Sequence, residues 1–143
     1  MFEREYRCLL NINCASKSLR HNPRLLIYGT CVRDEYPEIY RRFAENRVSV
    51  AICLEQYHIN IVALKVASIL ARIDLEELVV LTVDGSPHCI QLHHAVKEAV
   101  KVTGKSVKVR HYVVENGEAV EVSGSVVKIA RYLTKIKKLM ENK

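Results

Sequence analysis

Three short apolar runs, each followed by a stretch with helical periodicity, most strongly constrain how this chain can fold. The runs are RLLIY at 24–28, VSVAICL at 48–54 and ELVVLTV at 77–83. Each is apolar over several successive residues and bounded by polar or turn residues, which is typical of a strand buried on both faces of a sheet. Strands that alternate with helices predict a mainly parallel sheet, and right-handed crossovers place helices on both faces of it. We therefore expect an α/β fold, a three-layer α/β/α sandwich.

Local signals set the ends of several other elements. Pro37 suits the first turn of a helix, because its missing N–H is not needed there. Gly104 is well placed to cap the helix that follows the third apolar run. Asn116-Gly117 predicts a tight turn, so 107–114 and 119–122 should form a C-terminal antiparallel hairpin at one edge of the sheet. We further expect a strand within 4–12, a loop or short helical turn at 13–23, and a last helix capped by Ser125 whose apolar stripe runs to Met140.

Composition limits the class of protein. The 143 residues suit one domain, residues 1–143, and the 27% charged and 49% hydrophobic residues are ordinary for a soluble globular protein. The N-terminus is charged from Glu3 onward and lacks the apolar region of a secretory signal. The longest apolar run, 59–73, is interrupted by polar residues and is too short to span a membrane. We therefore expect a cytoplasmic location and no membrane partner.

Charge and exposed apolar surface indicate the kind of partner. The formal net charge is +6, and the last helix is rich in lysine. Only Tyr132 interleaves with those charges, whereas nucleic-acid surfaces combine basic groups with several aromatics, so a solvated face is expected and nucleic acid is an improbable partner. The 59–73 helix is apolar nearly all round, which favours a central position or cover by another subunit. A homo-oligomer or a redox protein partner is therefore expected.

Five cysteines are distributed along the chain, at positions 8, 14, 31, 53 and 89. Their odd number and the expected reducing compartment argue against a disulfide framework. Cys31, Cys53 and Cys89 each lie within a few residues of the end of one of the three apolar runs, and the carboxyl ends of parallel strands share one edge of a sheet. Thiolates are the ligands that iron–sulfur clusters and zinc prefer. The sequence thus predicts a metal site on these three cysteines, with Cys14 or His93 as a further ligand.

The preferred cofactor in that interpretation is an iron–sulfur cluster, with zinc as the alternative, and the role would be redox or cluster handling. His58 is a less favoured further ligand. No CxxC pair supports the site, so cysteines that merely fill the core remain an alternative, and Cys8 is expected to do so.

A thiol enzyme is another alternative. Cys89 would be the nucleophile near a helix N-terminus, with His93 or His88 as the base. Asp84 and Glu55 follow neighbouring strands, where they would orient a histidine or act as an acid/base pair. Asp84 also suits a turn. A third possibility is a homo-oligomeric interaction domain without catalysis.

Overall fold

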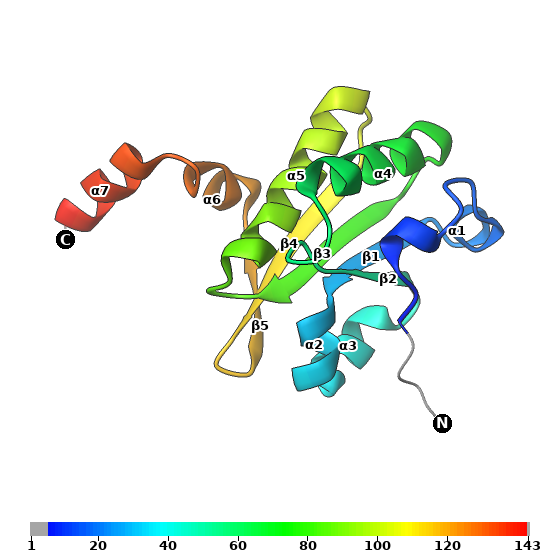
Figure 1. Cartoon of the computed structure of the whole chain (residues 1–143), viewed down its shortest axis with the longest axis horizontal. Helices are drawn as coiled ribbons and strands as arrows, with labels where there is room; N and C mark the ends of the chain where they lie inside the picture. The colour runs from blue at the N-terminus through cyan, green and yellow to red at the C-terminus, as the bar shows by residue number, and fades with distance from the viewer. Residues whose placement is uncertain (1–5, 143) are drawn as a thin grey trace.

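Five strands form one sheet in the order β2-β1-β3-β4-β5. The protein is described here by a computed structural model, in which residues 6–142 are defined (Figure 1). The strands are β1 Arg24–Gly29, β2 Val48–Ile52, β3 Glu77–Val83, β4 Lys108–Glu115 and β5 Glu118–Val122. Strands β2, β1, β3 and β4 pair in parallel, and β5 pairs antiparallel with β4 at the edge. The predicted mainly parallel sheet with an edge hairpin is confirmed.

Helices cover both faces of this sheet, which confirms the three-layer sandwich (Figure 1). The helices are α1 Lys17–His21, α2 Thr30–Glu35, α3 Pro37–Ala44, α4 Ile59–Arg72, α5 Pro87–Thr103, α6 Gly124–Ile129 and α7 Leu133–Glu141, with a short 3-10 helix, η1, at Leu9–Asn11. Successive strand residues alternate between two cores. Leu78 and Val80 pack with α4 and α5 on one face, whereas Val79 and Leu81 pack with α2 and α3 on the other.

Pro37, Gly104 and the Asn116-Gly117 pair occupy the turn and cap positions predicted for them. Pro37 opens α3, and Gly104 caps α5 in the left-handed conformation, with φ of 67°. Asn116 and Gly117 both have positive φ, 52° and 75°, which is the geometry that a two-residue hairpin turn requires. These local signals were therefore sufficient to place the ends of the elements around them.

The N-terminal strand prediction was wrong over most of its length. Residues 4 and 5 lie outside the described residues. Cys8 makes one isolated parallel bridge with Ala51, and the chain then turns into η1. Leu9 and Ile12 are buried through that turn against the core on the α4 and α5 face. The apolar residues at 9–12 thus serve a packed 3-10 turn, which explains why they do not alternate as a strand would.

The single C-terminal helix prediction was also wrong. Two helices replace it: α6, capped by Ser123 rather than Ser125, and α7. The chain leaves the helical path at Tyr132, whose φ and ψ of −108° and 95° are extended. Of the predicted stripe, Leu133 and Met140 are 79% and 68% exposed. In Figure 1, α7 projects away from the sheet, and none of its residues is buried.

Two findings concern the surface of the helices. No helix within residues 6–142 combines the length and the hydropathy that crossing a membrane requires. The apolar α4 is not wholly covered by the rest of the chain, because Ile61 and Leu64 are 54% and 68% exposed.

Candidate functional site

The connections of the sheet create a switch point between β1 and β3. Strand β1 lies between β2 and β3. The helices that follow β1 pack on one face, and the helix that follows β3 packs on the other. The chain therefore leaves these two strands in opposite directions, which opens a crevice at their carboxyl ends. Ligands in open α/β sheets bind in that crevice.

A small pocket of about 50 Å³ occupies this edge. It receives residues from the ends of β1, β2 and β3 and from the first turns of α5. The lining residues are Gly29, Thr30, Cys31, Ile52, Cys53, Leu54, Glu55, Thr82, Ser86, His88, Cys89 and Leu92. We call it the thiol pocket, because three of the five cysteines line it.

Each of the three cysteines is positioned by a different local structure. Cys31 is the second residue of α2, a short helix that the sequence did not indicate, and it is exposed. Cys53 follows β2 directly, and its carbonyl accepts from Gln56 N at 3.1 Å in a tight turn. The Cys89 amide donates to Ser86 Oγ at 3.3 Å, in the N-terminal cap of α5. The structure thus brings together the cysteines that the strand-end argument grouped.

Gly29 keeps room beside Cys89. A Cβ at this position would lie 3.9 Å from Cys89 Sγ, which is ordinary van der Waals contact. A larger side chain on the same bond would enter the pocket itself. Residue 29 therefore offers a way to block the pocket without altering a thiol.

The electrostatic surroundings of Cys31 oppose a negative charge. Desolvation by burial raises the pKa of the Cys31 thiol, and Cys89, Glu35, Cys53 and Glu55 raise it further. A nucleophilic cysteine needs the opposite, a depressed pKa. Thiols and carboxylates gathered in this way instead form a donor set that a cation would stabilise.

The pocket has no ready-made coordination sphere. Among residues 6–142, no three Cys, His, Asp or Glu side chains are already arranged to hold a metal ion. A cysteine side chain has one rotatable χ angle with three staggered positions. Binding through the thiol pocket would thus require these side chains to rotate toward one another.

His93 is engaged elsewhere. Its Nε2 lies 2.8 Å from Thr82 Oγ1, and its Nδ1 lies 2.9 Å from His111 Nδ1. Both ring nitrogens therefore have a partner, and neither is available to a metal or to Cys89 in this arrangement. Burial, His111 and His94 together lower the pKa of His93 to about 3. We refer to Thr82, His93 and His111, which these two contacts connect, as the Thr82–His93–His111 chain.

Other predicted site residues lie apart from the pocket. Cys14 packs against the core on the α4 and α5 face and does not line the pocket. Asp84 is exposed in the turn after β3, where its amide donates to Val114 O at 3.0 Å. His58 caps α4, and its Nδ1 accepts from Asn60 N at 3.1 Å. These residues have structural roles in turns, caps and packing.

Sequence reasoning missed Thr82 and His111 as members of the histidine chain. The signal was present in part, because His111 falls on the same face of its strand as Val107, Val109 and Val113. A histidine on an otherwise apolar strand face indicates a buried polar partner. The identity of that partner depends on strand order and register, which one sequence does not reveal.

The comparisons with known proteins identify the fold family. A family model described as a Rossmann-like domain matches residues 18–143. No curated protein and no solved structure matches the chain. The matched region contains the thiol pocket and the Thr82–His93–His111 chain, and it excludes Cys8 and Cys14.

Proposed function

The chain belongs to the Rossmann-like domain family, and we propose that it binds a thiolate-ligated metal at the switch point of its sheet. The observation that carries this proposal is that Cys31, Cys53 and Cys89, from three separate segments, line one pocket. In this proposal they are the protein ligands. His88 or Glu55, which line the same pocket, supplies a further one. Cys14 is left out because it does not line the pocket, and His93 is left out because both of its ring nitrogens already have partners.

The chemistry of the donors supports a soft metal. Zinc in structural sites is held by four ligands, and three thiolates with one histidine are a common set. An iron–sulfur cluster takes four thiolates and more space. A pocket of about 50 Å³ lined by three thiols suits a single ion more directly. We therefore place zinc-type binding first and keep the cluster as the second outcome.

Binding would be coupled to proton release. The pKa of the Cys31 thiol is raised, so this group is protonated near neutral pH. A metal must displace that proton before the sulfur can coordinate, which makes the affinity rise with pH. Because Cys31 is exposed, a bound metal would be accessible to a small molecule or to a redox partner. This is the part of the fold where such a ligand would approach.

Metal analysis of protein purified without oxygen tests the proposal. We expect near-stoichiometric zinc without acid-labile sulfide, or iron with sulfide and visible absorption if a cluster is bound. Cys31→Ser, Cys53→Ser and Cys89→Ser combined should abolish retention of either. Protein that holds no metal as purified and none after dialysis against zinc would overturn the proposal.

Two matched variants separate ligation from folding. Cys8→Ser with Cys14→Ser removes two thiols that do not line the pocket, and metal content should stay unchanged. Gly29→Val keeps all the thiols but fills the space beside Cys89, so metal retention should fall by at least about tenfold while the protein stays folded. Equal loss in the Cys8 and Cys14 variant would point to nonspecific thiol binding.

A thiol enzyme is the outcome to expect if no metal binds. Alkylation of the metal-free protein would then label Cys89 much faster than Cys31, whose raised pKa slows the reaction. His88 would be the remaining base, because both nitrogens of His93 have partners. Uniform slow labelling of all five cysteines would argue against this alternative.

Self-association through α4 is a second proposal, favoured by the exposed Ile61 and Leu64. Light scattering should give the mass of an oligomer for the unmodified chain. Leu64→Glu should shift that mass to the monomer, because burying an unpaired carboxylate in an apolar interface is costly. Thr134→Glu on α7 places the same charge elsewhere and should leave the mass unchanged. A monomer at all concentrations would contradict the proposal.

A further inference from the structure

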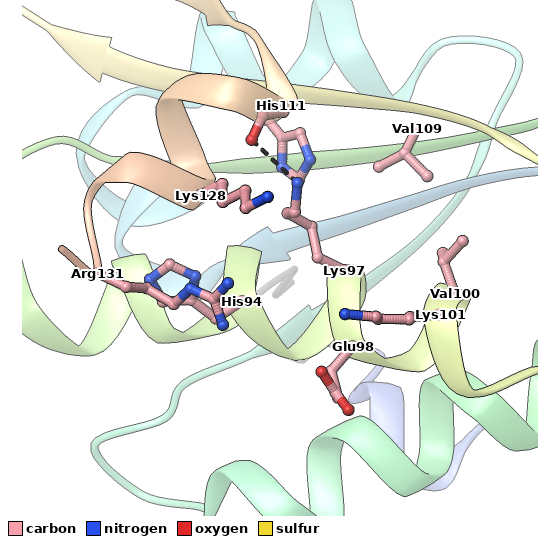
Figure 2. Close-up of a pocket in the computed structure, with 10 residues that line it drawn as sticks. His94, Lys97, Glu98, Val100, Lys101, Val109, His111, Lys128 and Arg131 are labelled. Carbon is pink, nitrogen blue, oxygen red and sulfur yellow. Dashed lines mark hydrogen bonds between the residues drawn. The ribbon is translucent and has the colours of Figure 1, made fainter.

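A second, larger pocket lies away from the switch point. It has a volume of about 420 Å³ and is bounded by α5, β4 and α6 on the sheet face that α5 covers (Figure 2). We call it the basic pocket. It does not share a lining residue with the thiol pocket, so it is a separate site.

Positive charge dominates its lining. Lys97 and Lys101 come from α5, Lys128 comes from α6, and Arg131 follows α6. Glu98 is the one carboxylate that lines it. Within residues 6–142, none of the four cations forms a salt bridge with a carboxylate. Among the described residues that line the pocket, only Glu98 offsets this charge, so it remains largely unpaired there.

Burial, and after it this positive charge, lowers the pKa values of the two histidines that line the pocket. Desolvation and then Arg131 and Lys97 lower the pKa of His94. Desolvation, Lys97 and His94 lower the pKa of His111 to about 4. Both rings are thus neutral near neutral pH, and each carries one N–H donor; the Nδ1 of His111 already lies 2.9 Å from the Nδ1 of His93. A bound anion would offset the positive charge of Lys97 and Arg131 that contributes to these lowered pKa values.

The geometry holds one cation in place. Lys97 Nζ donates to the Gly124 carbonyl at 2.9 Å, which fixes its long side chain between α5 and the start of α6. Figure 2 shows Lys128 directed toward the same space and His94 beside Arg131. The carbonyl uses one of the three ammonium donors of Lys97 and leaves others for a ligand. Val100 and Val109 provide an apolar wall nearby.

We propose that the basic pocket binds a small molecule that carries a phosphate or diphosphate group. Converging lysine and arginine side chains recognise this group by charge and by hydrogen bonds. The concave shape and the apolar wall suit a compact ligand with an organic part. A nucleic acid would need an extended basic surface with interleaved aromatics, and no Tyr or Phe is among the described residues that line this pocket.

Titration calorimetry with inorganic pyrophosphate, and with ADP as an organic probe that carries a diphosphate, tests this proposal. We expect saturable binding that weakens with added salt. Lys128→Gln with Arg131→Gln should weaken it at least about tenfold. Both residues are exposed, so the fold should tolerate this change. Lys135→Gln with Lys137→Gln removes the same charge from α7 and should leave binding unchanged.

A second measurement does not depend on a variant. Pyrophosphate should shift the ring resonances of His94 and His111 in NMR spectra and leave those of His21, on α1, unchanged. Equal weakening by the α7 control, the absence of saturable binding, or tighter binding of single-stranded RNA than of both probes would overturn the proposal.

Discussion

Acidification from about pH 7 to about pH 4.5 is expected to destabilise this protein by up to about 5 kcal/mol, because of two buried histidines. His93 and His111 are 1% and 3% exposed, and their Nδ1 atoms lie 2.9 Å apart. One proton suffices for that contact, since one nitrogen donates and the other accepts. Charging both rings would bring two N–H groups face to face.

The direction follows from where the protons bind. Burial is the main cause that lowers the pKa of His93 to about 3 and that of His111 to about 4. In the unfolded chain, a histidine titrates near its ordinary pKa of about 6.5. Between these values the unfolded state binds protons that the native state does not. The stability contributed by the neutral pair is therefore complete above about pH 6.5 and is lost as pH falls, by up to about 1.4 kcal/mol per unit for each histidine.

Urea denaturation at a series of pH values measures this effect. His93→Gln with His111→Gln removes both titrations and keeps polar groups that can bond with each other and with Thr82. The slope between about pH 6.5 and pH 4.5 should therefore fall to the contribution of His94, whose pKa is also lowered. His21→Gln, at an exposed position on α1, should keep the slope. The hydrogen bond with Arg47 lowers the pKa of Glu77, so the stability that ionised Glu77 contributes to the protein is lost only at more acidic pH. An unchanged slope in the double variant would contradict the assignment.

Most of the fold could be predicted from local signals. The apolar runs identified β1, β2 and β3 because parallel strands are buried on both faces. Gly104 and Asn116-Gly117 fixed their elements because few other residues adopt positive φ readily. The grouping of Cys31, Cys53 and Cys89 followed from the geometry of parallel strands alone. Each of these inferences used only the local sequence, the backbone preference of single residues or one general property of sheets.

The remaining features depend on tertiary contacts. Helical spacing placed Cys89 and His93 one turn apart, but the partners of His93 come from β3 and β4. Pairing of Val80 with His111 in the β3–β4 ladder brings that ring to α5, and sequence spacing does not encode this register. The break before α7 contains neither Gly nor Pro, so no breaker signal marks it. In the sequence alone, Lys97 and Lys128 have the pattern of solvent-exposed residues. Only the packing of α6 beside α5 brings them to the same pocket.

Leu92→Ala is expected to cost about 2–5 kcal/mol of the free energy of unfolding. Leu92 is 1% exposed and belongs to the core between α5 and the sheet. Its removal leaves a cavity that neighbouring side chains on a rigid strand and helix can fill only in part. Because Leu92 also lines the thiol pocket, this cavity adjoins Cys89.

Guanidinium denaturation of the unmodified chain, Leu92→Ala and Leu64→Ala measures that cost directly. Leu64→Ala makes the same chemical change at a site that is 68% exposed on α4, so within the monomer it should alter the free energy of unfolding by no more than about 0.5 kcal/mol. The larger pocket should also let a bulky maleimide label Cys89 faster. Equal costs for the two variants would mean that the first turns of α5 are not packed on the sheet. The thiol pocket would then lack the wall that Leu92 provides, and the metal-binding proposal would lose its structural basis.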